Sequence, residues 1–309
     1  MLSISALTHV YPNGTRALDD VSLEIPPGLY GLLGPNGAGK STLMRCLATL
    51  QLPTSGAIRF GDIDVLADPQ ALRATLGYLP QDFGVYPRVS AYEMLDHLAI
   101  LKGLTSGPAR RETVEALLQQ VNLWDVRKKA IAGFSGGMRQ RFGIAQALIG
   151  SPTLMIVDEP TAGLDPEERN RFNNLLAEIG ESKVVLLSTH IVDDVTDLCS
   201  RMAILVDGRV VSAGTPADLI AGLSGKVWTR AVEADELPAL RNQFELIATR
   251  LRGGRTVIHV LADAAPDPRF EPVAAGLAEV YFSTLHAQRK ARGLSTNEAA
   301  AGAAAIAAA

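Results

Sequence analysis

The chain has 309 residues, of which 47% are hydrophobic and 20% are charged, and its formal net charge at pH 7 is -4. This length is enough to bury a full hydrophobic core, and it favours one large and one small domain. The acidic balance argues against a nucleic-acid binder that works through a general basic surface, and it leaves open only a local basic patch. We expect no nucleic-acid partner.

The two cysteines, Cys46 and Cys199, lie far apart and have no neighbouring cysteine or histidine at metal-ligand spacing. We therefore expect neither a disulfide framework nor a zinc site, and we interpret both as small buried residues. The N-terminus lacks a basic region followed by an apolar core, and no eighteen apolar residues run together. We expect a chain that does not enter or cross a membrane unaided.

The first 25 residues are typical of antiparallel strands, because hydrophobic residues alternate with polar ones over residues 17–25. From residue 1 to about 222, short Val/Ile/Leu runs alternate with helical patterns. This alternation predicts an α/β domain in which helices cover a largely parallel sheet. We expect the N-terminal strands to lie against that sheet.

A helical insert is predicted at residues 90–125. It opens with Ser90 and Glu93, which have the spacing of a capping box, and it continues with leucines at helical intervals. We expect these residues to belong to a helical subdomain at about residues 88–150.

A small α+β domain is predicted at residues 223–286. Gly253 and Gly254 are typical of a two-residue hairpin turn. The expected elements, in order, are a strand at residues 227–232, a helix at 236–243, hairpin strands at 247–252 and 255–260, a helix at 269–277 and a strand at 279–282. Residues 287–309 are alanine-rich, and we expect a tail that is disordered or weakly helical.

A phosphate-binding pattern is present at Gly34, Gly39, Lys40 and Ser41. An apolar run of buried-strand type at residues 29–33 precedes it, and leucines at helical spacing follow it. Backbone N–H groups of such a loop surround an anion, to which the next helix points its positive end. Lys40 would contact the β and γ phosphates, and the Ser41 hydroxyl would bind magnesium. The alternative is a glycine-rich turn that binds nothing.

Two carboxylates follow a buried strand at residues 154–157. Asp158 is suited to hold magnesium through water, and Glu159 to orient, or accept a proton from, a water that attacks the γ phosphate. The alternative is that the pair caps the next helix. Ser135, Gly136 and Gly137 precede another helical pattern and predict a second anion site at a helix N-terminus, unless Ser135 is only a cap.

Six motifs occur in order across residues 2–222, and together they resemble the ATP-binding subunits of ABC transporters. They are the phosphate loop at residues 34–42, Gln81 after Tyr78-Leu79-Pro80, the signature Ser135-Gly136-Gly137, the pair Asp158-Glu159, Asp165 after Ala162-Gly163-Leu164, and His190 after Ser188-Thr189. The signature departs from the family's usual pattern at Phe134 and Met138, but the residues that would contact phosphate are intact. The resemblance implies a P-loop NTPase fold of the ABC type: a mixed sheet core, an antiparallel β subdomain and a helical subdomain.

The resemblance also implies roles for individual residues, with ATP and Mg²⁺ as cofactors. The nucleotide-binding residues would be Tyr11, Asn36, Gly37, Ala38, Gly39, Lys40, Ser41, Thr42, Ser135, Gly136, Gly137 and Asp165. The metal-binding residues would be Ser41, Gln81 and Asp158, and the catalytic residues would be Glu159, His190 and Gln81. Simpler alternatives remain for three of them: Tyr11 as a surface tyrosine, His190 as an ordinary residue at a strand end, and Asp165 as the start of a helix.

The family mechanism implies two partners. A second copy would pair head to tail, so that ATP on Lys40 of one copy meets Ser135 of the other, and separate membrane subunits would carry the substrate. The chain would then lie in the cytoplasm, peripheral on the cytoplasmic face of the cell membrane. Residues 32–36, 138–141 and 279–282 resemble the export-type subfamily. The alternatives are a mechanical or regulatory ATPase that acts on a membrane protein, or a module that acts on ribosomes or DNA.

Overall fold

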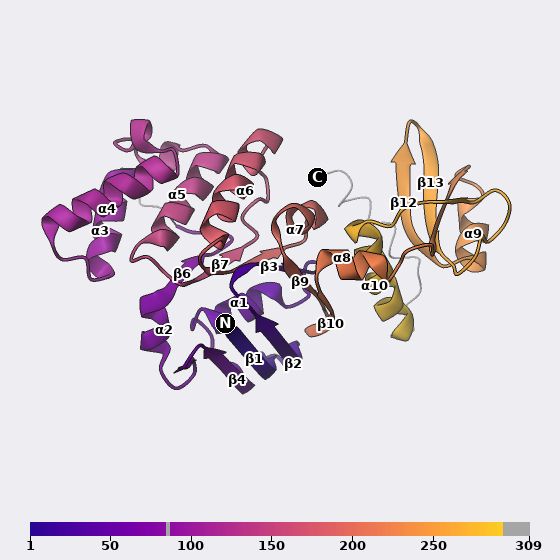
Figure 1. The fold of residues 1–309 in the computed structure, drawn as a ribbon, viewed down its shortest axis with the longest axis horizontal. Helices are drawn as coiled ribbons and strands as arrows, with labels where there is room; N and C mark the ends of the chain where they lie inside the picture. The colour runs from indigo at the N-terminus through magenta and orange to yellow at the C-terminus, as the bar shows by residue number, and fades with distance from the viewer. Residues whose placement is uncertain (85–86, 293–309) are drawn as a thin grey trace. The chain divides into compact units, whose positions relative to one another are not determined.

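A computed structural model describes residues 1–84 and 87–292. The chain divides into two units, Met1–Val210 and the part that begins at Val211. Figure 1 traces both along the chain. The domain boundary that the sequence suggests after residue 222 stays a prediction.

The first unit is built on a six-stranded sheet with the strand order β10-β9-β3-β8-β7-β6, of which the edge strand β10 continues past Val210. Its strands are β3 (Gly28–Leu33), β6 (Leu76–Leu79), β7 (Leu154–Asp158), β8 (Val184–Thr189), β9 (Arg201–Val206) and β10 (Arg209–Gly214). β3 pairs in parallel with β8 and β9, and β7 pairs in parallel with β6 and β8. Because parallel strands end at one edge, the segments that follow β3, β6, β7 and β8 meet there.

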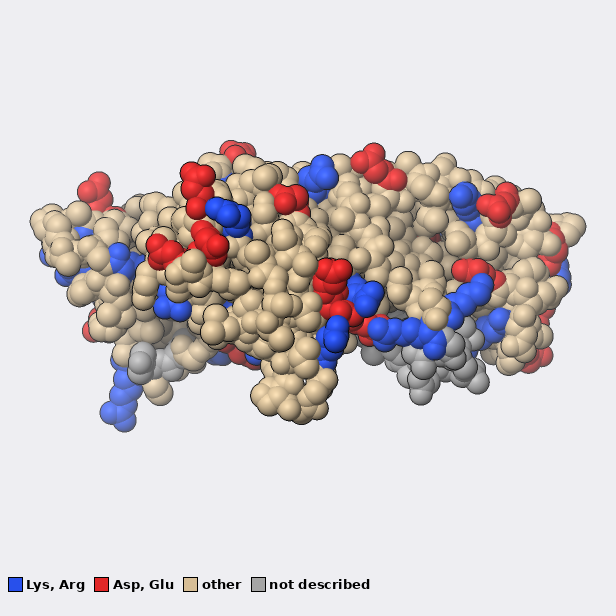
Figure 2. Space-filling model, turned by 90° about the horizontal axis from the view of Figure 1, so that it is seen from below, with Lys and Arg blue, Asp and Glu red and all other residues tan. Residues whose placement is uncertain are grey.

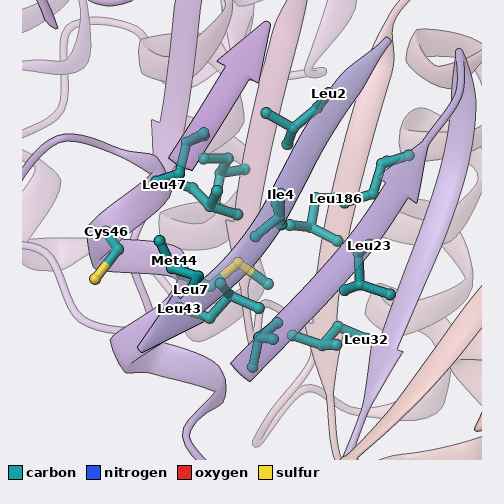
Figure 3. Packing of buried hydrophobic residues seen from close by; sticks show 14 of the residues in the cluster. Leu2, Ile4, Leu7, Leu23, Leu32, Leu43, Met44, Cys46, Leu47 and Leu186 are labelled. Atoms are coloured by element: carbon teal, nitrogen blue, oxygen red, sulfur yellow. The ribbon is translucent and has the colours of Figure 1, made fainter. Parts of the chain in front are cut away.

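A second sheet of four strands confirms the antiparallel N-terminal prediction. Its order is β2-β1-β4-β5, with β1 (Leu2–Val10), β2 (Arg16–Ile25), β4 (Ser55–Phe60) and β5 (Ile63–Asp64). Helix α1 (Lys40–Leu47) lies between the two sheets (Figure 1). Leu43 and Met44 on this helix point toward Ile4 and Leu7 of β1 and toward Leu32 of β3 (Figure 3). This shared core fixes α1, and hence the loop before it, against both sheets.

Helices cover the opposite face of the six-stranded sheet (Figure 1). The first unit also contains α2 (Pro69–Thr75), α3 (Ala91–Leu101), α4 (Gly107–Gln120), α5 (Gly136–Leu148), α6 (Pro166–Gly180) and α7 (Val192–Leu198), with short 3₁₀ turns at Trp124–Val126 and Ile131–Gly133. Ser90 and Glu93 form the predicted capping box, since the Glu93 N–H donates to Ser90 Oγ (3.3 Å) and the Ser90 N–H to Glu93 Oε2 (2.9 Å). Helices α3 and α4 confirm the helical elements expected at residues 90–125, and the helical subdomain at about residues 88–150 stays a prediction.

The second unit contains a four-stranded sheet in the order β12-β13-β11-β14. Its elements are α8 (Pro216–Ala221), β11 (Val227–Val232), α9 (Leu237–Gln243), β12 (Leu246–Arg252), β13 (Arg255–Leu261), β14 (Glu271–Pro272) and α10 (Leu277–Ala291). The hairpin prediction is confirmed: Gly253 and Gly254 have φ values of 55° and 80°, which the two central residues of a type I′ turn require.

Two element predictions for this unit are wrong. Residues 269–277 contain the short strand β14 in place of a helix, because Pro272 lies at the sheet edge and Gly276 starts the next element. Residues 279–282 belong to α10 in place of a strand. The aromatic and β-branched run resembles a strand, but Leu277, Val280, Tyr281 and Leu285 are buried at helical spacing, and Glu279 caps the helix through the Gly276 N–H (2.9 Å).

The predicted tail at residues 287–309 lies mostly outside the described residues, which end at residue 292. Its first residues belong to α10, which extends to Ala291. Cys46 and Cys199 are free and buried as expected, and burial raises their pKa values to about 11 and about 12.

No helix within residues 1–84 and 87–292 combines the length and apolar character needed to span a membrane. On the face in Figure 2, both charge signs are scattered among broad uncharged areas.

Candidate active site

The loop between β3 and α1 has a backbone that only glycine fits at key positions. Gly37 and Gly39 have φ values of 80° and 103°, in the left-handed region. A Cβ on Gly39 would lie 2.3 Å from the Ala17 carbonyl oxygen, and one on Gly34 would lie 2.4 Å from that of Leu205. No side chain caps the start of α1. The first-turn N–H groups are therefore left for an anion, as the phosphate-loop prediction requires.

Lys40 is the first residue of α1, and its side chain is only 4% exposed. Its ammonium donates to the carbonyl oxygens of Gly34 (2.7 Å) and Pro35 (3.2 Å), and it lies 3.1 Å from Glu159 Oε1. A buried ammonium needs such partners, because burial of an unpaired charge is strongly unfavourable. The lysine of the loop and the carboxylate after β7 thus form one buried ion pair.

Glu159 contacts the other two predicted catalytic residues, Gln81 and His190. Its Oε2 lies 3.1 Å from His190 Nδ1 and 3.5 Å from Gln81 Nε2. Its backbone has a φ of 47°, which is uncommon for a residue other than glycine, and its N–H donates to the Ser188 carbonyl oxygen (3.0 Å). Strained backbone of this kind is typical of functional sites, where the surrounding structure holds it in place. The structure therefore brings Gln81, Glu159 and His190 together around Lys40.

Asp158 is buried at the end of β7 and accepts a hydrogen bond from the Ser188 hydroxyl. Ser41, Gln81 and Asp158 offer hydroxyl, amide and carboxylate oxygens, which are the ligand types that Mg²⁺ prefers. Among the described residues, no group of three or more His, Cys, Asp or Glu side chains is placed to hold a metal ion. The chemistry of these donors fits magnesium, whose remaining ligands would be water and phosphate oxygens, and the metal-binding roles of the three residues stay predictions.

Tyr11 is attached to the phosphate loop. Its hydroxyl lies 3.0 Å from Thr42 Oγ1, Arg45 donates to it (3.4 Å), and the His9 ring packs edge-on at 4.7 Å. Burial raises the pKa of Tyr11, but the hydrogen bonds of the hydroxyl with Thr42 and Gln51 and the Arg45 charge outweigh this and leave the pKa below its ordinary value. The Tyr11 ring is thus positioned beside the loop, where it could contact a nucleotide base.

The signature residues and Asp165 occupy helix starts. Ser135 caps α5 by accepting from the Met138 N–H (3.2 Å), and Asp165 caps α6 by accepting from the Glu168 N–H (2.9 Å). Within the described part of the chain, no hydrogen bond or ion pair joins Ser135 or Asp165 to Lys40 or to Glu159. The capping roles are therefore present, and the nucleotide contacts predicted for Ser135, Gly136, Gly137 and Asp165 stay predictions.

The structure also shows contacts that the motifs did not indicate. Thr161 and Thr189 both donate to Asp194, a buried carboxylate on α7. In the sequence, Asp194 is preceded by a second aspartate, Asp193, in the first turn of the same helix. Which of the two is buried depends on which face of α7 packs against the rest of the first unit, and the sequence does not show this. The ion pair between Lys40 and Glu159 is likewise a product of the sheet topology.

Comparisons with known proteins agree with one another. A family model described as ABC transporter matches residues 18–162. The daunorubicin/doxorubicin resistance ATP-binding protein DrrA of Streptomyces peucetius is 39% identical over 228 residues, which cover 73% of this chain and 68% of DrrA. The methionine import ATP-binding protein MetN of Cupriavidus metallidurans is 35% identical over 276 residues, which cover 85% of this chain and 79% of MetN.

Solved structures give the same result for the fold. The bacterial ABC transporter cassette MJ0796 has been solved as a dimer, and also as a dimer in a post-hydrolysis state with ADP and Pi. Both structures are 28% identical in sequence and superpose with a TM-score of 0.64. Each match covers 70% of this chain and 98% of the cassette.

Proposed function

The chain belongs to the family of ABC transporter ATP-binding proteins, and from this premise we propose that it drives export of a substrate through separate membrane subunits. It is an ATP-binding transporter subunit and an ATP hydrolase. The observation that carries the site assignment is the convergence of Lys40, Glu159 and His190 at one sheet edge.

In the proposed mechanism, ATP binds in the loop before α1, and its phosphates replace Glu159 as the ion-pair partner of the Lys40 ammonium. Glu159 then orients the attacking water and accepts its proton, while His190 and Gln81 hold the γ phosphate and the water in place. Magnesium, when bound near Ser41 and Asp158, would neutralise charge that develops on the phosphates. Tyr11 would stack on the adenine.

We propose that two copies act together, head to tail. Ser135, Gly136 and Gly137 start a helix whose N–H groups suit a phosphate, yet they make no hydrogen bond or ion pair with Lys40 of their own copy within the described residues. A second copy could bring this signature to the ATP held by the first. The dimeric state of the cassette MJ0796 supports this arrangement.

A hollow on the first unit suits the membrane subunits. Its volume is about 650 Å³, and its lining includes Leu50 after α1 and Leu101 on α3, which are 63% and 69% exposed. Exposed leucines at a hollow gain stability when a partner removes them from water. We propose that an apolar segment of a membrane subunit binds there, which would place the chain on the cytoplasmic face of the membrane.

The direction of transport is proposed from likeness. The name of DrrA describes drug resistance, whereas that of MetN describes import. Residues 32–36 and 138–141 resemble export-type subunits, and we therefore propose export. The second candidate is a mechanical ATPase that acts on a membrane protein without transport, and it would use the same site.

The test of the site is the substitution Glu159→Gln, with Glu178→Gln, an exposed glutamate on α6, as the control. Glu159→Gln keeps the shape of the side chain but removes the charge that accepts the proton. We expect it to abolish ATP turnover and to trap an ATP-bound dimer, as seen by size-exclusion chromatography with light scattering. Glu178→Gln should hydrolyse ATP at the normal rate. Unchanged turnover in Glu159→Gln would refute the assignment of the catalytic base.

A further inference from the structure

Asp194 is a fully buried carboxylate, with 0% of its surface exposed, in the first turn of α7. Its Oδ2 accepts hydrogen bonds from the hydroxyls of Thr161 (2.6 Å) and Thr189 (3.2 Å). Its Oδ1 accepts from Arg169 Nε at 2.8 Å, an ion pair with a side chain that is 26% exposed. Both oxygens are therefore satisfied, by donors from three different segments.

Each of these donors lies within four residues, in the sequence, of a residue of the proposed site. Thr161 follows Glu159 by two residues, and Thr189 immediately precedes His190. Arg169 lies one turn after Asp165, whose carbonyl oxygen accepts from the Arg169 N–H (2.9 Å). One carboxylate thus joins the loops that carry the base, the histidine and Asp165.

The bond to Thr189 also fixes the backbone around His190. The Thr189 hydroxyl donates to Asp194 and, through its oxygen, accepts from the N–H of Ile191 (2.9 Å). The residues on both sides of His190 are therefore tied to the same buried group. His190 Nδ1 and Glu159 Oε2 lie only 3.1 Å apart, so a small shift of either loop would change this contact.

A buried charge is strongly unfavourable unless it is paired and hydrogen-bonded, and the loss of one partner leaves the others unsatisfied. The carboxylate can hold all three donors at once because it offers two oxygens with about four acceptor positions. An amide in its place offers one acceptor oxygen, so it cannot keep all three donors in position. The charge of Asp194 is therefore what the arrangement requires.

We propose that Asp194 is a positioning residue for ATP hydrolysis, which sets the place of His190 relative to Glu159 and to the Asp165 loop. This inference rests on the proposed roles of Glu159 and His190. Asp194 acts through these residues, and it makes no hydrogen bond or ion pair with the phosphate loop within the described residues. It should therefore affect the rate of hydrolysis and leave nucleotide binding intact.

The experiment compares Asp194→Asn with Asp193→Asn in the full chain. Asp193 lies in the same helical turn but is exposed, so the control makes the same chemical change at the same helix end. We expect Asp194→Asn to lower kcat by about tenfold or more while the Kd for ATP changes by less than about twofold, because misplaced catalytic groups slow the chemical step. Asp193→Asn should match the wild type in both.

The number of ATP molecules bound per chain separates positioning from general stability. A variant that merely unfolds loses binding sites and turnover in parallel. If the turnover of Asp194→Asn per bound ATP equals that of Asp193→Asn, the inference is overturned. The Glu159→Gln measurement distinguishes a failure of the proposed site from a failure of the present inference. Full ATP turnover in Glu159→Gln refutes the proposed site. Loss of turnover in Glu159→Gln together with normal turnover in Asp194→Asn refutes only the positioning role of Asp194.

A second pair of variants decides the matter if Asp194→Asn does not fold. Thr189→Ser keeps the hydroxyl that joins Asp194 to the Ile191 N–H, whereas Thr189→Val keeps the shape and removes the hydroxyl. We expect Thr189→Ser to retain kcat and Thr189→Val to lose about tenfold or more, with ATP bound by both. Equal kcat values in the two variants would overturn the inference.

Discussion

Glu279 makes the second unit sensitive to acid. One oxygen of its carboxylate accepts from Arg250 (3.0 Å) and lies 3.1 Å from His259 Nδ1, and the other accepts from the Gly276 N–H (2.9 Å). The side chain is 7% exposed. Glu279 therefore ties the start of α10 to β12 and β13, and its charge has partners only in the folded state.

The size of the effect follows from the pKa. Burial acts to raise the pKa of Glu279, but the hydrogen bonds with His259 and the Gly276 N–H and the Arg250 charge outweigh burial and lower it from 4.5 to about 2. A fall of this size corresponds to about 3 kcal/mol of unfolding free energy. Because the folded-state pKa is the lower one, this stability is fully present above about pH 4.5 and is lost as the pH falls toward 2.

The assay requires a fluorescent reporter in the second unit. The chain has two tryptophans. Trp228 lies in β11 and donates to the Ala262 carbonyl oxygen (3.0 Å), so Trp124→Phe would leave it as the only tryptophan. In this background, Glu279→Gln should lower the unfolding free energy in guanidinium by about 3 kcal/mol at pH 7. The difference in unfolding free energy between the Trp124→Phe protein with Glu279 and the one with Glu279→Gln should shrink to about half at pH 3.

The exposed glutamate Glu271 on β14 provides the matched control, and Glu271→Gln should change stability by less than about 0.5 kcal/mol. Other carboxylates titrate over the same pH range, but they are common to both proteins and cancel in the difference. A difference at pH 7 below about 0.5 kcal/mol, or one that does not shrink in acid, would refute the reasoning about Glu279.

Much of the site could be predicted because its motifs act locally. The left-handed glycines of the phosphate loop and the caps at Ser90, Ser135 and Asp165 depend on a few consecutive residues. Strands of the parallel sheet could be recognised as short apolar runs, because both faces of such a sheet are buried. The ion pair between Lys40 and Glu159 was not predicted, because it depends on the strand order of the sheet, which brings the ends of β3 and β7 to the same edge.

The errors and omissions have a physical cause in tertiary structure. The run Val280-Tyr281-Phe282 has the composition of a strand, but α10 buries Val280 and Tyr281 at helical spacing and starts at the cap made by Glu279. Asp194 could not be distinguished from Asp193, since burial of one aspartate depends on where α7 lies against Thr161 and Thr189. Local patterns predict elements, whereas packing selects which side chains meet.

The remaining predictions concern the loop and the dimer. Lys40→Ala should weaken ATP binding by about tenfold to a hundredfold in a fluorescent-nucleotide titration, because a hydrogen bond from a charged group contributes about 1.5–3 kcal/mol. Ser135→Arg should bind ATP normally and lose hydrolysis, because in the proposed head-to-tail dimer the signature of one copy would complete the site of the other. A mixture of the two variants tests this directly: a mixed dimer pairs the intact loop of the Ser135→Arg copy with the intact signature of the Lys40→Ala copy. At an ATP concentration too low to load Lys40→Ala, the mixture should regain ATP turnover that neither variant shows alone, and a mixture as inactive as its components would contradict the head-to-tail arrangement.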